Sequence, residues 1–210
     1  SISLHEASLF SCAVMTGVGA VLNTAQVRPG ATVGVVGLGG VGLNALLAAK
    51  MLGAEKIIAI DPVESKLMLA RELGATHTFN ANDPKCIEAV REVTNGGVEY
   101  AFEMAGSVVA MDTTYRITRR GGTSCSSGLS HPDHHFSLSH LSLVAEEKTI
   151  KGSYMGSCIP ARDIPRYISM YQRGLLPLQK LISAHIKLDD INEAFDTLDA
   201  GETVRQIITF

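Results

Sequence analysis

The sequence is short of cysteine, of net charge and of uninterrupted apolar stretches. Its four cysteines, Cys12, Cys86, Cys125 and Cys158, include no CxxC pair. This spacing argues against a disulfide framework or a zinc knuckle and favours a reduced, cytoplasmic chain. Eighteen Lys and Arg against 21 Asp and Glu give a formal net charge of −3. We therefore expect no electrostatic attraction to nucleic acid or to an anionic membrane.

Two charge-free stretches have the length of membrane helices. Residues 7–27 and 31–49 contain 21 and 19 residues without a charged side chain. Six polar side chains interrupt the first stretch and five glycines the second, whereas a bilayer span is predominantly apolar and helical. His5 and Glu6 lie where a secretory signal carries positive charge. We expect neither a membrane span nor a signal peptide.

Between residues 31 and 155, short β-type runs alternate with helical patterns. Six strands are predicted, at Thr32–Gly37, Lys56–Ile60, Thr76–Phe79, Val98–Glu103, Gly122–Ser127 and Thr149–Tyr154. Asp83-Pro84 predicts the start of one intervening helix, as an N-cap followed by proline at the first helical position. The alternation predicts an α/β fold, a doubly wound six-stranded parallel sheet of the Rossmann type.

The two flanks of this central part are irregular. Residues 1–30 are predicted to form a helix that leads into a turn at Arg28-Pro29-Gly30. Residues 156–210 are predicted to hold two helices and two strands, the last strand at Val204–Phe210. The chain exceeds a common domain of about 100–150 residues yet falls short of two. We divide it into a connecting segment (1–30), a dinucleotide-binding domain (31–155) and a return segment (156–210).

Gly37-Leu38-Gly39-Gly40-Val41-Gly42 fits the pattern G-x-G-x-x-G. It follows an apolar strand, opens a helix and is answered by Asp61, 19 residues past Gly42. In such a loop the first glycine permits the tight turn, the second admits a pyrophosphate and the third allows close helix–strand packing. The helix N-terminus offers free N–H groups and a positive dipole to phosphates. The alternative, a purely structural turn, is disfavoured by the acidic residue in register.

Asp61 also predicts which dinucleotide binds. A carboxylate accepts hydrogen bonds from the adenosine ribose hydroxyls and repels a 2′-phosphate. No Arg lies in Pro62–Ser65 to receive that phosphate, so NAD is favoured over NADP. A helix-capping role for Asp61 is compatible with ribose binding.

Several segments together resemble one family, the zinc-containing medium-chain alcohol dehydrogenases. These segments are Cys12–Gly19, Gly37–Gly42, Asp61, Lys66, Phe102–Gly106 and Gly201–Phe210. The resemblance covers essentially all 210 residues and is closest to the animal-type and glutathione-dependent formaldehyde dehydrogenase branch. It implies hydride transfer between an alcohol or aldehyde and NAD, with zinc as a Lewis acid on the alcohol.

The resemblance also implies roles for single residues. Cys12 matches a ligand of the catalytic zinc, and Thr16 matches the residue that packs against the nicotinamide. Further coenzyme contacts are implied for Val41 at the other nicotinamide face, Lys66 at a ribose, Arg205 at the pyrophosphate, and Ser127, Leu129, Ser153 and Met155 at the carboxamide end.

Judged by its chemistry alone, Cys12 is a lone thiol in an apolar segment, most often a small buried hydrophobe. A catalytic zinc needs three protein ligands, and in the family the other ligands, the structural zinc lobe and the proton-relay histidine precede the position of Cys12. We expect the C-terminal portion of a larger enzyme, whose flanks belong to a missing catalytic domain. Such a portion would hold NAD, bind zinc only with that domain and turn nothing over alone. The alternative is a non-catalytic dinucleotide-binding module with a regulatory role.

Two further features are open. The four histidines of His131–His140 could bind metal, but a solvated loop is favoured because no cysteine or spaced ligand pair joins them. In the resembled family Phe136–Leu141 supplies edge strands across a dimer two-fold, so a homodimer is expected. Glu103 lies in an otherwise apolar strand and requires a buried partner that the sequence does not identify.

Overall fold

A six-stranded parallel sheet forms the centre of the chain, of which the computed structural model describes residues 2–210. The strand order is β3-β2-β1-β4-β5-β6. The strands are β1 (Thr32–Val36), β2 (Lys56–Asp61), β3 (His77–Asn80), β4 (Val98–Glu103), β5 (Thr118–Ser126) and β6 (Thr149–Gly152). Every neighbouring pair is parallel, which confirms the predicted doubly wound sheet.

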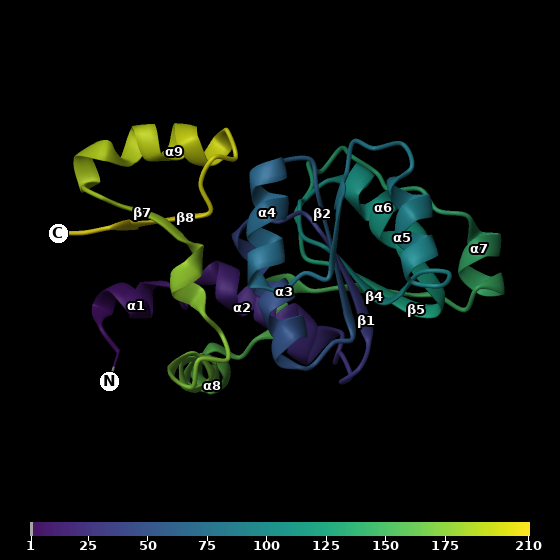
Figure 1. The fold of residues 1–210 in the computed structure, drawn as a ribbon, viewed down its shortest axis with the longest axis horizontal. Helices are drawn as coiled ribbons and strands as arrows, with labels where there is room; N and C mark the ends of the chain where they lie inside the picture. Colours follow the sequence, from purple (N-terminus) through teal and green to yellow (C-terminus); the bar gives the residue numbers. More distant parts are fainter. Residues whose placement is uncertain (1) are drawn as a thin grey trace.

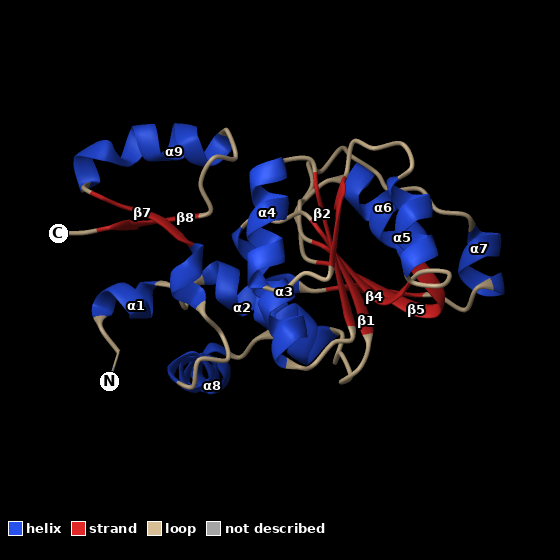
Figure 2. Ribbon diagram, viewed as in Figure 1, coloured by secondary structure: helices blue, strands red, loops and turns tan. Residues whose placement is uncertain are grey.

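Helices cover both faces of this sheet (Figures 1 and 2). Those on one face are α3 (Gly40–Met51) and α4 (Glu64–Leu73), and those on the other are α5 (Cys86–Val93) and α6 (Val108–Ile117). β1 and β2 are almost continuously apolar and buried, as parallel strands covered on both faces require. No helix within residues 2–210 is long and apolar enough to span a membrane.

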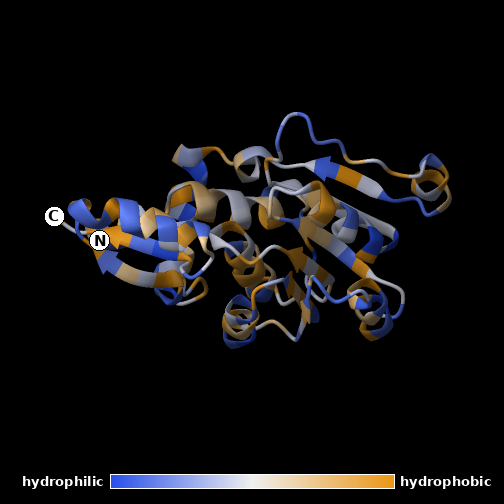
Figure 3. Cartoon of the chain, turned by 90° about the horizontal axis from the view of Figure 1, so that it is seen from above, coloured by the Kyte–Doolittle hydropathy of each residue, from blue (hydrophilic) through white to orange (hydrophobic). Residues whose placement is uncertain are grey.

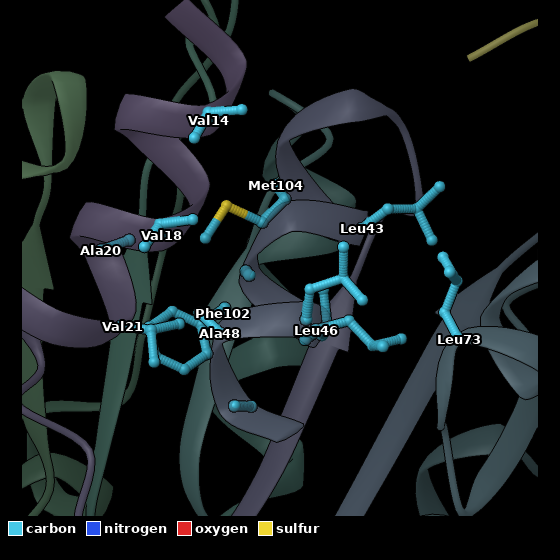
Figure 4. Packing of buried hydrophobic residues seen from close by; sticks show 14 of the residues in the cluster. Val14, Val18, Ala20, Val21, Leu43, Leu46, Ala48, Leu73, Phe102 and Met104 are labelled. Atoms are coloured by element: carbon cyan, nitrogen blue, oxygen red, sulfur yellow. The ribbon is translucent and has the colours of Figure 1, made fainter. Parts of the chain in front are cut away.

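The N-terminal segment packs against α3. It contains α1 (Leu4–Ser8), α2 (Cys12–Gly19) and a π-helical turn, η1 (Ala20–Thr24). The predicted 1–30 segment begins at Ser1, which lies outside the described residues. Figure 4 shows Val14, Val18 and Val21 of this segment in the same hydrophobic core as Leu43 and Leu46 of α3. Burial of these side chains attaches the segment to the sheet domain.

α2 and α3 cross at a glycine. A Cβ added at Gly17 would collide with the carbonyl oxygen of Val41 and lie 2.7 Å from the Cβ of Asn44. Only a residue without a side chain lets the two helix backbones approach this closely. The contact brings α2 to the first turn of α3.

The C-terminal part forms a small separate layer. After α7 (His140–Ala145) and the short helix η2 (Tyr154–Ser157), α8 (Pro160–Gln172) is followed by η3 (Leu178–Leu181), β7 (Ile182–Ile186), η4 (Leu188–Asp190), α9 (Ile191–Asp199) and β8 (Arg205–Ile208). β7 and β8 pair in parallel outside the main sheet. Both chain ends lie on the side of this layer (Figure 3), and none of the residues of α9 is buried.

One predicted helix start is wrong. α5 begins at Cys86, two residues after the proline of Asp83-Pro84. The Asp83 carboxylate accepts a hydrogen bond from the Lys85 amide at 2.8 Å, and its carbonyl accepts one from the Cys86 amide at 2.9 Å. Asp83 therefore closes a turn before the helix, since a side-chain bond to the amide two residues on is the typical alternative to capping.

Candidate coenzyme-binding site

A cavity of about 460 Å³ opens at the carboxyl ends of β1, β2 and β4. The strand order reverses between β1 and β4, and ligands of open α/β sheets bind in the crevice at such a switch point. Of the predicted coenzyme residues, Gly37, Leu38, Gly39, Asp61 and Lys66 line the cavity. The structure thus brings the glycine loop and the acidic residue together around one space.

Three glycines shape the loop between β1 and α3 in different ways. Gly37 has φ +93°, a left-handed conformation that favours glycine. A Cβ added at Gly42 would collide with the carbonyl oxygen of Gly37, whereas a Cβ at Gly39 would meet nothing within 4 Å. Gly37 and Gly42 are therefore required by the turn itself, and Gly39 leaves open space at the N-terminus of α3.

Asp61 fixes the loop from the end of β2. Its carboxylate accepts hydrogen bonds from the Leu38 amide at 2.7 Å and from the Val63 amide at 3.0 Å. Each carboxylate oxygen keeps a second lone pair, so acceptor capacity remains toward the cavity. The residue holds the loop and borders the ligand space at once.

Arg205 reaches the glycine loop from β8. A Cβ added at Gly40 would collide with its guanidinium, which makes no ion pair with a carboxylate of residues 2–210. Burial lowers the pKa of Arg205. An unpaired, half-buried guanidinium beside a helix N-terminus has the chemistry of an anion site.

A second contact ties the C-terminal layer to the cavity. A Cβ added at Gly201 would lie 3.2 Å from the Lys66 ammonium nitrogen, and Lys66 lines the cavity from α4. The chain between α9 and β8 therefore crosses close to α4, and β8 then places Arg205 at α3.

Cys12 and Thr16 lie one turn apart on α2. The Cys12 thiol is exposed, its sulfur 3.9 Å from Thr16 Oγ1, and Thr16 is buried. A Cβ added at Gly156 would collide with the Met15 carbonyl oxygen and lie 2.9 Å from that of Thr16. The predicted Met155 is thus next to a residue packed against α2, and the buried Ser153 precedes it. We call Cys12, Thr16, Ser153 and Met155 the reaction end.

Ser127 and Leu129 follow β5. The Ser127 hydroxyl is buried and has no hydrogen-bond partner among the described residues. The Leu129 side chain is 79% exposed, while its carbonyl oxygen would lie 2.9 Å from a Cβ at Gly106. The Leu129 backbone therefore lies against Gly106, and the Ser127 hydroxyl keeps an unused donor and acceptor.

The hydrogen bonds that Glu103 accepts could not be identified from the sequence. Its carboxylate accepts hydrogen bonds from the Ala105 and Gly106 amides at 2.8 and 2.6 Å. It also accepts them from Ser126 Oγ at 2.8 Å and from the Gly128 amide at 3.2 Å. These donors are the buried partner that the sequence left open, and they join the turn after β4 to the turn after β5. The acidic residue at a strand end was the available signal.

The residues present fit a dinucleotide better than they fit a metal ion. The open face of Gly39, the unpaired Arg205 and the orphan Ser127 hydroxyl suit a pyrophosphate and an amide. Within residues 2–210 no group of three or more His, Cys, Asp or Glu side chains is placed to hold a metal ion. The histidines of His131–His140 are exposed, and Cys12 alone supplies too few ligands for zinc.

Comparison with known proteins agrees with this geometry. A family model described as zinc-binding dehydrogenase matches residues 40–173, more than half of the chain. The chain belongs to the zinc-binding dehydrogenase family. Over 208 residues this chain is 36% identical to alcohol dehydrogenase 1 of Trifolium repens, covering 98% of the chain and 54% of the relative. A class-3 alcohol dehydrogenase of Caenorhabditis elegans is also 36% identical, with 99% and 56% coverage.

Solved structures of the family have the same fold. Benzyl alcohol dehydrogenase from Acinetobacter calcoaceticus matches with a TM-score of 0.95 at 35% identity, covering 99% of this chain and 57% of that one. Alcohol dehydrogenase TADH from Thermus sp. ATN1 matches with a TM-score of 0.89 at 26% identity, covering 100% and 59%. The chain spans about half the length of the curated relatives it matches.

Proposed function

We propose that this chain is the NAD-binding portion of a zinc-dependent alcohol dehydrogenase that transfers hydride between an alcohol and NAD. The observation that carries the proposal is the cavity of about 460 Å³ lined by Gly37–Gly39, Asp61 and Lys66, beside the unpaired guanidinium of Arg205. The names of the relatives, alcohol dehydrogenases of a plant and a nematode, support the reaction class.

Each part of the cavity suits one part of NAD. The pyrophosphate is expected at the N-terminus of α3, between the open side of Gly39 and the Arg205 guanidinium. The ribose of the adenosine half is expected between Asp61 and Lys66, and the adenine against the apolar wall that Ala105 and Ala110 line. Gly40, Val41 and Gly42 complete the loop beneath the phosphates.

The nicotinamide is expected at the reaction end. Thr16 would pack on one of its faces and Val41 on the other, while Ser127, Leu129, Ser153 and Met155 would hold the carboxamide. The proximity of the α2 and α3 backbones at Gly17 supports this arrangement, since it joins the loop to the segment that carries Thr16. Bound there, NAD supplies the hydride acceptor, and the chain orients it and excludes water.

Zinc binding is proposed only together with residues outside these 210. Cys12 would be one ligand, exposed on α2, and a catalytic zinc takes three protein ligands. We propose that residues 1–30 and 156–210 pack with a catalytic domain that provides the others, and that residues 31–155 are the coenzyme domain. The exposed Phe195, Leu188 and Leu198 in and beside α9 support a partner domain for the return segment.

A homodimer is also part of the proposal. β6 is an edge strand of the sheet, and its Ile150 is exposed. Residues 136–141, expected as edge strands, instead form a loop and the start of α7, where Leu138, Leu141 and Val144 are also exposed. An unpaired edge with apolar neighbours favours pairing with another strand. Light scattering that gives the mass of a monomer at high protein concentration would contradict the dimer.

Two finer points complete the proposal. The plant and nematode relatives share the same 36% identity with the chain. Assignment to the animal-type and glutathione-dependent branch therefore rests on the sequence resemblance alone. Free thiols at all four cysteines support a reducing compartment, and we propose the cytoplasm.

The test is coenzyme binding by the 210-residue chain. NADH fluorescence and calorimetry are expected to give tighter binding of NADH than of NADPH, because the Asp61 carboxylate repels a 2′-phosphate. The substitution Asp61→Ser is expected to reduce that preference. Folded chain that binds neither coenzyme, or NADPH at least as tightly, would contradict the proposal. Alcohol oxidation with stoichiometric zinc by the chain alone would contradict the need for further ligands.

A further inference from the structure

The short helix η2 holds three successive residues in the left-handed region. Met155 has φ 49° and ψ 32°, Gly156 has φ 66° and ψ 21°, and Ser157 has φ 49°. This conformation is unfavourable for residues that carry a Cβ. Such backbone persists where its surroundings over-determine it, and it gathers at ligand-binding sites. Neighbouring residues must therefore restrain this turn, and its strained backbone points to a role in ligand binding.

Two side chains of η1 supply one restraint. The Asn23 amide donates a hydrogen bond to the Gly156 carbonyl oxygen at 3.2 Å. The Thr24 hydroxyl lies 2.8 Å from the hydroxyls of both Ser153 and Ser157. One hydroxyl has a donor and two lone pairs, so Thr24 serves both serines at once. The π-helical turn that carries Asn23 and Thr24 is of a rare kind often found at functional sites.

A second restraint comes from α2. The Cys158 thiol donates a hydrogen bond to the Met15 carbonyl oxygen at 3.2 Å, and Gly156 is packed against the backbone of α2. The turn is therefore attached to the segment that carries Cys12 and Thr16. It begins directly after β6, at the carboxyl edge of the sheet where ligands of this fold bind.

We propose that Thr24, assisted by Asn23, is a positioning residue that holds Ser153–Ser157 in the left-handed turn so that its backbone receives the nicotinamide carboxamide. Neither residue was among the predicted coenzyme contacts. This inference rests on the proposed function, because it assumes that the nicotinamide lies at the reaction end. It assigns to η1 the geometry of that end only, and the phosphate loop is independent of it.

The experiment compares two ligands on matched variants of the 210-residue chain. ADP-ribose contains the adenosine and pyrophosphate of NADH but no nicotinamide, so the difference between their affinities reports the reaction end. Thr24→Val removes the hydroxyl at constant shape and is expected to weaken NADH binding about five- to tenfold, the effect of one or two hydrogen bonds. ADP-ribose binding is expected to change less than about twofold. Thr24→Ser restores the hydroxyl and is expected to restore NADH binding.

Each outcome decides one point. If Thr24→Val weakened NADH and ADP-ribose binding equally, Thr24 would have a general structural role. If NADH binding were unchanged, Thr24 would have no role at the site. Either result overturns the inference. If Thr24→Val does not fold, Ser157→Ala removes an exposed partner of the same hydroxyl and is expected to give a selective NADH loss. Folded unsubstituted chain that binds ADP-ribose and NADH equally overturns the inference alone, whereas binding of neither overturns the proposed function.

Discussion

The two ends of the candidate coenzyme site are built in different ways. At the phosphate end, six consecutive residues, Gly37–Gly42, make the loop, and the demands on them are those of the backbone itself. At the reaction end, side chains of η1 hydrogen-bond to residues 153 and 156, and the Cys158 thiol bonds to the backbone of α2. A local loop can be specified by a short pattern, whereas a junction of distant segments depends on the whole fold.

The largest expected effect tests the phosphate end. Gly42→Ala places a Cβ onto the Gly37 carbonyl oxygen, a backbone atom that cannot move without opening the turn. We expect a loss of about 3 kcal/mol in the free energy of unfolding, the upper range for overpacking, and loss of NADH binding. Urea unfolding and NADH fluorescence measure the two effects.

Gly39→Ala is the matched control within the same loop. A Cβ at Gly39 meets nothing within 4 Å, so stability is expected to change by less than about 0.5 kcal/mol. NADH binding should still weaken, because the methyl group occupies the space through which the pyrophosphate approaches. Unchanged NADH affinity in a stable Gly39→Ala chain would place the phosphates elsewhere.

Arg205 reaches the phosphate end from β8, near the C-terminus of the chain. Arg205→Ala is expected to weaken NADH and ADP-ribose alike by about 10- to 100-fold, the value of a charge-assisted hydrogen bond to phosphate. Stability should not fall, since the substitution removes a half-buried cation that has no carboxylate partner among the described residues.

Calorimetry with both ligands checks this expectation, and Arg116→Ala is the control. Arg116 pairs only with Asp112 on the surface of α6, and such pairs contribute little. If Arg205→Ala weakened NADH binding and left ADP-ribose binding unaffected, Arg205 would act at the reaction end and not at the phosphate end.

Features that depend on residues close together in the sequence could be predicted from it. Gly37–Gly42 and Asp61 could be predicted because both lie within one strand–helix–strand unit, β1-α3-β2, and the alternation of apolar runs predicted the six strands. Asp83-Pro84 misled because the same residues stabilise a turn and cap a helix, and only the path of the following chain decides.

The rest depends on contacts between distant segments. Glu103 finds its partners at residues 126 and 128 as well as beside itself, and Thr24 finds its partners at 153 and 157. No periodicity or spacing in the sequence relates these positions. Gly17 and Gly156 carry no pattern either, although each is required by a close approach of two backbones.

Glu103 joins the turn after β4 to the turn after β5, so its substitution tests whether one carboxylate holds both turns. Glu103→Gln replaces a carboxylate oxygen by an NH₂ group that faces backbone and hydroxyl donors. Leaving those donors unsatisfied is expected to cost about 1–3 kcal/mol of stability. Hydrogen exchange should accelerate both at residues 105–107 and at residues 126–128.

The exposed Glu88→Gln on α5 is the control and is expected to change neither exchange rate. Faster exchange in Glu103→Gln at only one of the two turns would show that the carboxylate anchors that turn alone, and that the turn after β4 and the turn after β5 are held independently.

The smallest expected effect is a pH dependence of the sheet behind the reaction end. Burial raises the pKa of the Cys125 thiol to about 12, although nearby Lys151 and Ser153 act in the opposite direction. Because the folded pKa lies above the unfolded value, the thiol contributes its full stability below about pH 8.5. That contribution is lost as pH rises toward 12, since the unfolded chain ionises first. At pH 9 the loss is expected to be about 0.8 kcal/mol. Urea unfolding at pH 7 and pH 9 measures this loss in the free energy of unfolding. Cys125→Ala should reduce the difference between the two pH values by the same amount. The control Val90→Ala, a truncation of another buried side chain, should leave the difference unchanged.

An equal pH dependence in both variants would mean that the Cys125 thiol reaches solvent, and the sheet behind Ser153 would then be more open than the phosphate end.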